Sequence, residues 1–222
     1  MVRGPLNLRL ERSHSNLLGV RLDFSDHESA YIRFSRWRSK GVWPRVANVL
    51  AGETEIEHIL IDSTVARAYQ HSAGALKNGP QALGRSRGGL STKLHLAEDS
   101  KGRPLRLIVT EGRVADISCA AQLVEHLRTG AVIADKGYDA DHFAQRIRAT
   151  RAKVVIPPRS NRKTKRRYNR VLYRTRNPAE RFFDRIKHFR RVSIRYDKLA
   201  ESYLVFASLA CAFGPVVNVK TT

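Results

Sequence analysis

The sequence is poor in cysteine, in acidic residues and in long apolar runs. Its two cysteines, Cys119 and Cys211, lie far apart and belong to no CxxC or Cys/His cluster. This spacing argues against a structural zinc site and predicts buried free thiols in a reducing compartment. The longest apolar run, 203–219, is broken by Gly214 and Pro215 and is too short to span a bilayer, and the N-terminus lacks a signal-peptide core. We therefore expect a cytoplasmic protein with no membrane partner.

The shortage of acidic residues leaves a strong positive charge. Of 222 residues, 41 are Lys or Arg and 20 are Asp or Glu, so the formal net charge is +21. Such an excess suits a polyanion, and nucleic acid is the leading partner. The span 151–191 holds sixteen cations against two acids, Glu180 and Asp184. Within it, 159–170 has seven cations and no acid, which indicates either a solvated loop or a phosphate-binding one.

The length predicts one compact domain with an N-terminal appendage. Residues 1–27 show no periodicity, and we expect an irregular or disordered segment. Helical spacing over 28–50, broken at Gly41, predicts two short helices in an appendage of residues 28–55. Basic residues on these helices fit a solvated face better than a DNA contact. The main domain is then 56–213, followed by a tail at 214–222.

The main domain alternates strand and helix patterns, which predicts an α/β fold. A glycine-rich basic loop at 74–89 could approach phosphates, although it is weak as a nucleotide-binding motif. His95 falls on the polar face of a predicted hairpin, where solvation or hydrogen bonding fits better than metal ligation. The expected strands are 57–64, 90–97, 105–110, 131–134 and 154–156. The expected helices are one that Asp116 caps and whose core face reaches Leu127, one at 140–149 and one at 198–213.

Three carboxylates stand at predicted element ends. Asp62 ends the first strand, Asp135 ends the strand 131–134 and is followed by Gly137, and Glu180 lies on a later helix. An aspartate at a strand end is often only a turn or cap. If the three converge, however, they could hold two divalent ions, because Mg²⁺ prefers hard oxygen ligands and a metal pair clamps both oxygens of an in-line phosphoryl displacement.

The helix that carries Glu180 is predicted to begin with Asn177 as N-cap and Pro178 at its first position. The spacing of Asn177 and Glu180 also fits a capping box, so Glu180 could simply close the helix start. One face of this helix is apolar and the other charged. The apolar face holds Phe182, Phe183, Ile186 and Phe189, and the charged face holds Glu180, Asp184, Lys187 and Arg191.

The spacing Tyr173-x2-Arg176-x3-Glu180-x6-Lys187 resembles the Tyr-Arg-Glu-Lys signature of bacterial insertion-sequence DDE transposases. Further segments of the chain are similar to the same family, over about 31–210. These segments are IDSTVARAYQHSAGA, QALGRSRGGLSTKLH, IADKGYDA, VIPPRSNRK, RNPAERFFDRIKHFRR and RYDKLAESYL.

The resemblance implies a ribonuclease H-like fold and a DNA transposase that cleaves phosphodiesters at element ends and transfers the strands into target DNA. It implies that Asp62, Asp135 and Glu180 bind Mg²⁺ or Mn²⁺ and catalyse the reaction. The implied partner is double-stranded DNA, namely the terminal inverted repeats and the target, bound by a homo-oligomer associated with the bacterial nucleoid. The implied DNA contacts are Lys136, Tyr173, Arg176 and Lys187, to which the basic run adds Arg162, Lys163, Lys165 and Arg166.

Two alternatives differ in class from a transposase. Residues 1–27 match nothing in the family, which allows a truncated or frame-altered copy that occupies element ends as a catalytically silent DNA-binding protein. A basic RNA-binding protein explains the net charge but not three acids at element ends.

Overall fold

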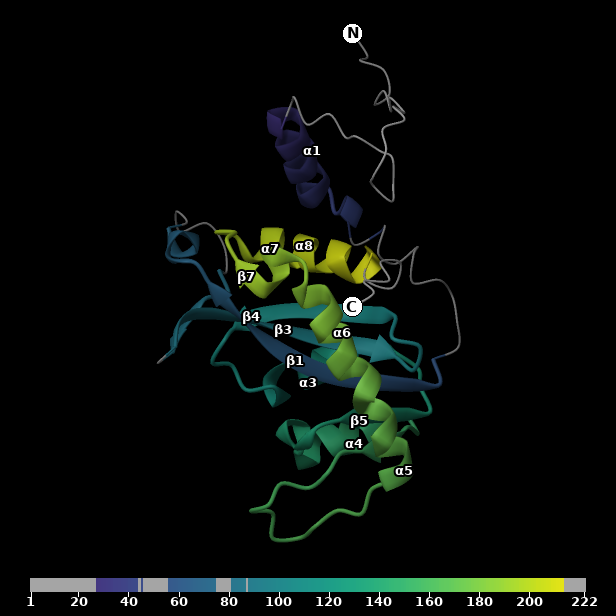
Figure 1. The fold of residues 1–222 in the computed structure, drawn as a ribbon. Helices are drawn as coiled ribbons and strands as arrows, with labels where there is room; N and C mark the ends of the chain where they lie inside the picture. Colours follow the sequence, from purple (N-terminus) through teal and green to yellow (C-terminus); the bar gives the residue numbers. More distant parts are fainter. Residues whose placement is uncertain (1–26, 44, 46–55, 75–80, 87, 214–222) are drawn as a thin grey trace, which may run out of the picture. The chain divides into compact units, whose positions relative to one another are not determined.

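The computed structural model describes residues 27–43, 45, 56–74, 81–86 and 88–213 (Figure 1). The chain divides into two units, 1–40 and 41–222. In the first, α1 (His27–Ser39) confirms the first helix of the predicted appendage. Gly41 has a φ of 61°, in the left-handed region that favours glycine, and helical backbone resumes at 42. The predicted segment 1–27, apart from His27, the remainder of the second helix and the tail 214–222 lie outside the described residues.

The second unit is built on a mixed sheet whose central strand is β1 (His58–Ala68). On one side β1 pairs antiparallel with β3 (Gly89–Asp99), which pairs antiparallel with β4 (Pro104–Glu111). On the other side β5 (Ala131–Ala134) runs parallel to β1, and β6 (Lys153–Val155) runs parallel to β5. These five strands lie side by side in the order β4-β3-β1-β5-β6, with β4, β3 and β1 antiparallel to one another in turn and β5 and β6 parallel to β1. This is the ribonuclease H-like order, and it confirms the predicted α/β class.

Two short strands extend the sheet beyond the prediction. β7 (Ile194–Arg195) lies parallel to the end of β1, and β2 (Gly84–Ser86) pairs with β3. The prediction that 84–86 belong to a loop was therefore wrong. The prediction that β1 ends near Asp62 was also wrong, since β1 continues for six residues, paired with β3 as far as Arg67. Neighbours distant in sequence stabilise this extension, which has no continuous apolar run of its own.

One face of the sheet is covered by α3 (Ile117–Leu123) and α4 (Asp141–Ala149). Both helices present apolar residues to Ile59 and Ile61 of β1, and these pack with Leu123 and Phe143 in a buried cluster. The predicted helix 140–149 and its parallel strands are confirmed. The helix after Asp116 is shorter than predicted, because it ends at Leu123, although the side chains of Val124 and Leu127 still pack on the core.

The other face is covered by helices that follow the basic run. They are α5 (Arg170–Tyr173), η3 (Arg174–Arg176), α6 (Asn177–Lys187), α7 (Arg190–Ser193) and α8 (Ala200–Phe213). Figure 1 shows α6 crossing in front of the sheet, in contact with β1. Phe182, Phe183 and Ile186 are buried against Leu94 and Leu96 of β3, as predicted. The last helix packs under the sheet in the same cluster, also as predicted.

Phe189 corrects the predicted apolar stripe, since its side chain is 36% exposed. The cause is local, because α6 ends at Lys187 and the backbone of Phe189 is extended, so the helical spacing does not reach it. Val192 of α7 is buried in the cluster instead. For the same reason Arg191 does not continue the charged face of α6; its guanidinium lies over the ring of Phe206, 4.3 Å from the centroid.

The junction between β7 and α8 is built around a fully buried arginine. Arg195 donates to the carbonyl oxygens of Gln81, Ala82, Asp197 and Lys198 and to the hydroxyl of Thr92, at 2.6–3.2 Å. Because the buried guanidinium nitrogens each find an oxygen acceptor, these hydrogen bonds offset the free-energy cost of removing the charge from water. Arg195 thereby joins the end of the glycine-rich loop to the start of α8.

Several smaller predictions can be compared with the structure. Cys119 and Cys211 are buried and free, as predicted. His95 is fully buried and hydrogen-bonded to the Thr110 hydroxyl at 2.9 Å, so a hydrogen-bonded role is confirmed and a solvated one is wrong. Burial lowers the pKa of His95 to about 4. Among the described residues, no helix combines the length and the apolar character needed to cross a membrane.

Candidate active site

Asp62 and Asp135 occupy neighbouring positions on adjacent parallel strands. The last register pair between β1 and β5 is Ile61 with Ala134, and each aspartate is the next residue of its strand. The backbone of Asp135 is still extended, with φ −77° and ψ 175°. Residues at matching register on parallel strands project to the same face, ~4.8 Å apart at the backbone. The predicted approach of these two carboxylates is therefore present in the fold.

The face on which they lie is the one that α6 crosses. Leu96, the partner of Asp62 in the β1–β3 register, belongs to the core beneath α6 and α8. Leu60 and Ile133, each two residues before an aspartate, pack with Tyr173 of α5. Since side chains alternate along a strand, both aspartates project toward α5, η3 and α6.

The Asp62 carboxylate is bound on both oxygens. Its Oδ1 accepts from the backbone N–H of Ser63 at 2.9 Å, and its Oδ2 pairs with Nη2 of Arg176 at 3.0 Å. Burial is the largest influence on the pKa of Asp62 and raises it; Arg176 opposes this, Asp135 adds to it, and the pKa lies above its ordinary value. The guanidinium of Arg176 thus supplies positive charge to a site crowded with carboxylates.

Asp135 is held by the turn that follows it. Its Oδ1 accepts from the N–H of Gly137 at 2.8 Å, at the start of η2 (Lys136–Tyr138). A Cβ at position 137 would lie 2.9 Å from this oxygen and 3.3 Å from Oδ2 of Asp116. Glycine was predicted here for a sharp exit of the chain, and the close approach of two carboxylates adds a further requirement for it.

The helix carrying Glu180 begins earlier than predicted. α6 begins at Asn177, and its N-cap residue is Arg176, whose backbone is helical and which makes no side-chain capping bond. The side-chain oxygen of Asn169 caps the preceding short helix α5, where it accepts from the N–H groups of Val171 and Leu172. Assignment of Asn177 as N-cap was wrong. Pro178 cannot donate a backbone hydrogen bond to the preceding turn, which explains why the backbone just before α6 is the tighter 3₁₀ turn η3 and not α-helix. Position 177 lies inside a helical path, which disfavours a capping box with Glu180.

Glu180 lies on α6, one turn after Arg176. Its side chain lies outside the part of the chain that the structure describes. Among the described side chains, no group of three or more His, Cys, Asp or Glu lies close enough to hold a metal ion. The two described aspartates nevertheless fit a hard divalent cation: they offer carboxylate oxygens from neighbouring register positions, and the charge of Asp135 contributes to the raised pKa of Asp62.

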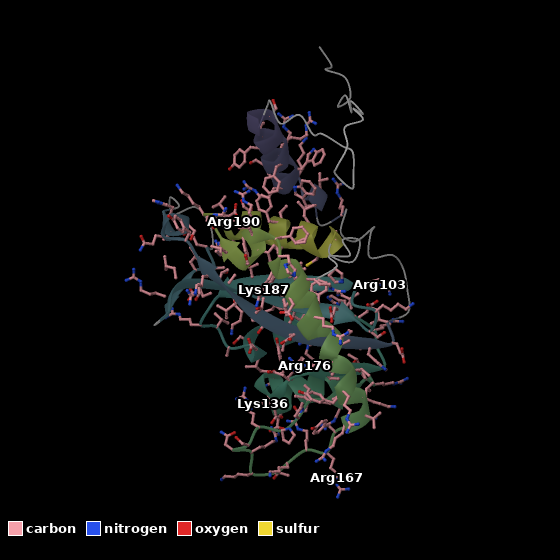
Figure 2. The ribbon with its side chains drawn as sticks, in the orientation of Figure 1. Arg103, Lys136, Arg167, Arg176, Lys187 and Arg190 are labelled. Carbon is pink, nitrogen blue, oxygen red and sulfur yellow. The ribbon has the colours of Figure 1, made fainter. Side chains whose placement is uncertain are left out.

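Exposed cations surround this face. Figure 2 shows Arg176 between Lys136 and Lys187 in its view, with Arg167 on the loop before α5. Lys136, Lys163, Lys165 and Lys187 are exposed, as a phosphate contact requires. Tyr173 is partly buried against the core cluster and packs edge-on against Tyr168, 5.5 Å between ring centroids.

The basic run 159–170 was predicted to be either a solvated or a phosphate-binding loop, and two of its arginines are instead paired with acids of the fold. Arg162 and Arg166 each pair with Asp139 at 3.0 Å and also with Asp141, and their side chains are 18% and 15% exposed. The backbone N–H of Arg159 donates to Asp139 at 2.9 Å, and its guanidinium donates to the carbonyls of residues 136 and 137. The run is thereby attached to the turn that follows Asp135.

Asp116 was predicted to cap α3 and does not. Its backbone is helical and it makes no capping hydrogen bond, because its Oδ1 instead accepts from Ser63 Oγ at 2.7 Å and Lys93 Nζ at 2.9 Å. Sequence reasoning also missed Glu98, a fully buried carboxyl on β3. The available signal was the two-residue period of the strand: Glu98 follows Leu94 and Leu96 at that spacing and therefore belongs to their apolar face.

A sheet of this order, with paired aspartates on its central strands in a chain this basic, is typical of proteins that transfer phosphoryl groups on nucleic acids. Residues 53–213 match the family described as Transposase DDE domain. The chain belongs to that family and is a DNA transposase of the insertion-sequence type.

Relatives of known name agree with this assignment. The chain is 38% identical over 128 residues to the protein named as transposase for insertion sequence element IS6501 in Brucella ovis, covering 55% of this chain and 96% of that protein. It is 30% identical over 150 residues to the corresponding protein of IS402 in Burkholderia cepacia, covering 62% and 68%. A solved piggyBac transposase synaptic complex with hairpin DNA is similar at a TM-score of 0.49 and 14% identity, covering 88% of this chain and 54% of that one.

Proposed function

We propose that this chain cleaves phosphodiester bonds at the ends of its element and joins the freed 3′-hydroxyl to target DNA, as an oligomer on the inverted repeats. The observation that carries the proposal is the adjacency of Asp62 and Asp135 on the face crossed by α6, which bears Glu180. These three carboxylates would hold divalent ions, Mg²⁺ or Mn²⁺. When bound, the metals supply charge that stabilises the attacking and leaving oxygens.

The chain's own residues position the DNA. Lys136 follows Asp135 directly, Lys187 lies on α6 above the aspartate face, and both are exposed, so they can bind phosphates near the scissile bond. Lys163 and Lys165 extend the same contact along the loop before α5. Tyr173 supports the loop from within the core and offers its partly exposed edge to DNA.

Arg176 has a double role in this proposal. Without DNA its guanidinium neutralises Asp62 at 3.0 Å. A backbone phosphate competes for the same planar donors, and guanidinium groups bind phosphate in a bidentate manner. Entry of DNA would thus transfer Arg176 from the carboxylate to the phosphate and leave Asp62 open to a cation.

The test is strand cleavage on a duplex made from inverted repeats that flank the gene. Asp62→Asn, Asp135→Asn and Glu180→Gln each remove ligand charge at nearly constant shape, and each should lower Mg²⁺-dependent nicking below about one hundredth of the wild-type rate while the duplex still binds. Asp184→Asn is the matched control, since Asp184 is an exposed acid on the same helix.

Two results would overturn the proposal. If Glu180→Gln kept wild-type nicking, α6 would not contribute a ligand. If the wild-type chain bound the duplex tightly and never nicked it with Mg²⁺ or Mn²⁺, the chain would be a silent DNA-binding protein derived from an element.

A further inference from the structure

A second polar cluster lies directly behind the paired aspartates, on the face covered by α3. It consists of Ser63, Lys93 and Asp116. Ser63 follows Asp62 and therefore projects to the opposite face of β1, where its hydroxyl donates to Asp116 Oδ1 at 2.7 Å. Lys93 donates to the same oxygen at 2.9 Å and to the carbonyl oxygen of Val114 at 2.8 Å. Its side chain is only 13% exposed, so its charge is directed at Asp116.

The cluster is linked to Asp62 through Ser63 and to Asp135 through Gly137. On the Asp62 side, the backbone N–H of Ser63 is the donor to Asp62 Oδ1, and its hydroxyl is fixed by Asp116. On the Asp135 side, the Cβ position of Gly137 lies 3.3 Å from Asp116 Oδ2 and 2.9 Å from Asp135 Oδ1. Asp116 thus abuts the glycine whose N–H binds Asp135.

The charge of Asp116 is maintained in this setting. Burial is the largest influence on its pKa and would raise it, but the hydrogen bonds from Ser63 and Lys93 and the charge of Lys93 together bring the pKa below its ordinary value. Asp116 contributes no capping bond to α3, so holding a helix start does not account for it.

We propose that Asp116 is a positioning residue for the metal-binding pair, with Ser63 and Lys93 as its partners. It fixes the two backbone N–H groups that orient the Asp62 and Asp135 carboxylates, and Lys93 balances the charge that it adds. Groups that hydrogen-bond directly to metal ligands commonly change metal affinity about 10- to 100-fold when they are removed, and Asp116 acts on Asp62 through one such group, the backbone N–H of Ser63. This inference rests on the proposed function, because it assumes that the aspartates bind a divalent ion.

The experiment measures Mn²⁺ binding to the whole chain mixed with the inverted-repeat duplex, with the duplex alone as the blank, from the electron paramagnetic resonance signal of the free ion. Asp116→Asn should weaken Mn²⁺ binding about 10-fold, the lower end of the range for direct partners, because Asp116 acts one hydrogen bond further from the ligands. Ser63→Ala removes a single hydrogen bond, and we expect a several-fold loss in the same direction. Asp99→Asn is the matched control, because Asp99 is also buried and paired with an arginine, Arg103, but lies at the other end of the β1–β3 register, opposite Ile59. It should lower the melting temperature and leave Mn²⁺ affinity unchanged.

The outcomes separate the inference from the proposed function. Wild-type affinity in Asp116→Asn and in Ser63→Ala, alongside lost binding in Asp62→Asn, would overturn the inference alone. Absence of Mn²⁺ binding by the wild-type chain would overturn both. If Asp116→Asn did not fold, the Mn²⁺ affinity of Ser63→Ala would test the inference, since loss of one hydroxyl from the strand leaves the sheet register intact.

Discussion

Arginines hold both the junction between β7 and α8 and the basic run 159–170. At the junction the arginine is buried against neutral oxygens, whereas in the basic run the arginines pair with acids. Arg195 is fully buried and donates to four carbonyls and a hydroxyl. Arg162 and Arg166 stay partly exposed and pair with Asp139 and Asp141. A net charge of +21 therefore overstates the charge available to DNA, because some arginines bind the fold itself.

The largest effect is expected at the buried arginine. Arg195→Met fills a similar volume but leaves several carbonyls without a donor, and it should cost about 3–5 kcal/mol of unfolding free energy. Urea unfolding of the metal-free protein measures this loss. Arg195→Lys is the control: one ammonium cannot replace a planar fork, so it should recover only part of the stability. A loss below about 1 kcal/mol for Arg195→Met would show that the junction is held by packing alone.

Glu98 is buried like Arg195, but unlike Arg195 its charged group lacks hydrogen-bond partners among the described residues. Neither carboxylate oxygen of Glu98 has a hydrogen-bond partner among the described residues, and the charged groups nearest to it are Arg185, Asp99 and Asp62. Burial raises its pKa to about 8, so the folded state holds a proton that the unfolded state has lost above its ordinary pKa. Stability is then highest below the ordinary pKa and falls by about 1.4 kcal/mol per pH unit as pH rises toward 8.

Glu98→Gln should remove this slope and stabilise the protein at pH 8. The measurement is urea unfolding in metal-free buffer between pH 6.5 and 8. Below pH 6.5 the lowered pKa of His95 acts in the other direction, since its stabilising contribution is lost as pH falls toward 4. Parallel curves for the two proteins above pH 6.5 would contradict the assignment of a protonated Glu98.

A smaller effect is expected at the paired arginines of the loop. Arg162→Met removes one of two guanidiniums that share a buried Asp139, and it should cost about 1.5–3 kcal/mol. Thermal unfolding at two salt concentrations measures it. The exposed Arg170, two residues beyond Tyr168, is the control and should change stability by less than about 0.5 kcal/mol on the same substitution.

The smallest effect on stability, and the clearest one on DNA binding, is expected at the exposed cations of the same loop. Replacing Lys163, Lys165 and Arg167 with Gln should flatten the plot of log affinity against log salt by about 0.9 for each phosphate that is no longer neutralised. Fluorescence anisotropy with a labelled duplex measures the slope. An unchanged slope would make these side chains solvated bystanders and would remove the distinction between paired and free cations.

The order of strands and helices could be predicted because each element carries its own signal. The apolar run before Asp135, the turn at Gly137 and the amphipathic spacing of Phe182, Phe183 and Ile186 are local properties. The resemblance to transposases then assigned Asp62 and Asp135 to one site, and the register of β1 and β5 agrees with that assignment.

What could not be predicted depends on contacts between distant parts of the chain. β1 extends past Asp62 because β3 and β7 pair with it, and Arg195 is buried because the carbonyls of Gln81 and Ala82 reach it from more than a hundred residues away. Asp116 looked like a helix cap because Ser63 and Lys93 are its neighbours only in space. A charge count likewise cannot tell Arg162, which is paired, from Lys163, which is exposed.

The unbroken length of β1 has a consequence for how copies of this gene can diverge. Its eleven residues pair with β5 before Asp62, with β7 after it and with β3 along almost the whole strand. One inserted residue would turn every side chain beyond it to the opposite face. The surface turn at 100–103, by contrast, can lengthen without moving either aspartate. Small insertions should therefore accumulate between Asp62 and Asp135 in related elements, while the strand that carries Asp62 keeps its length.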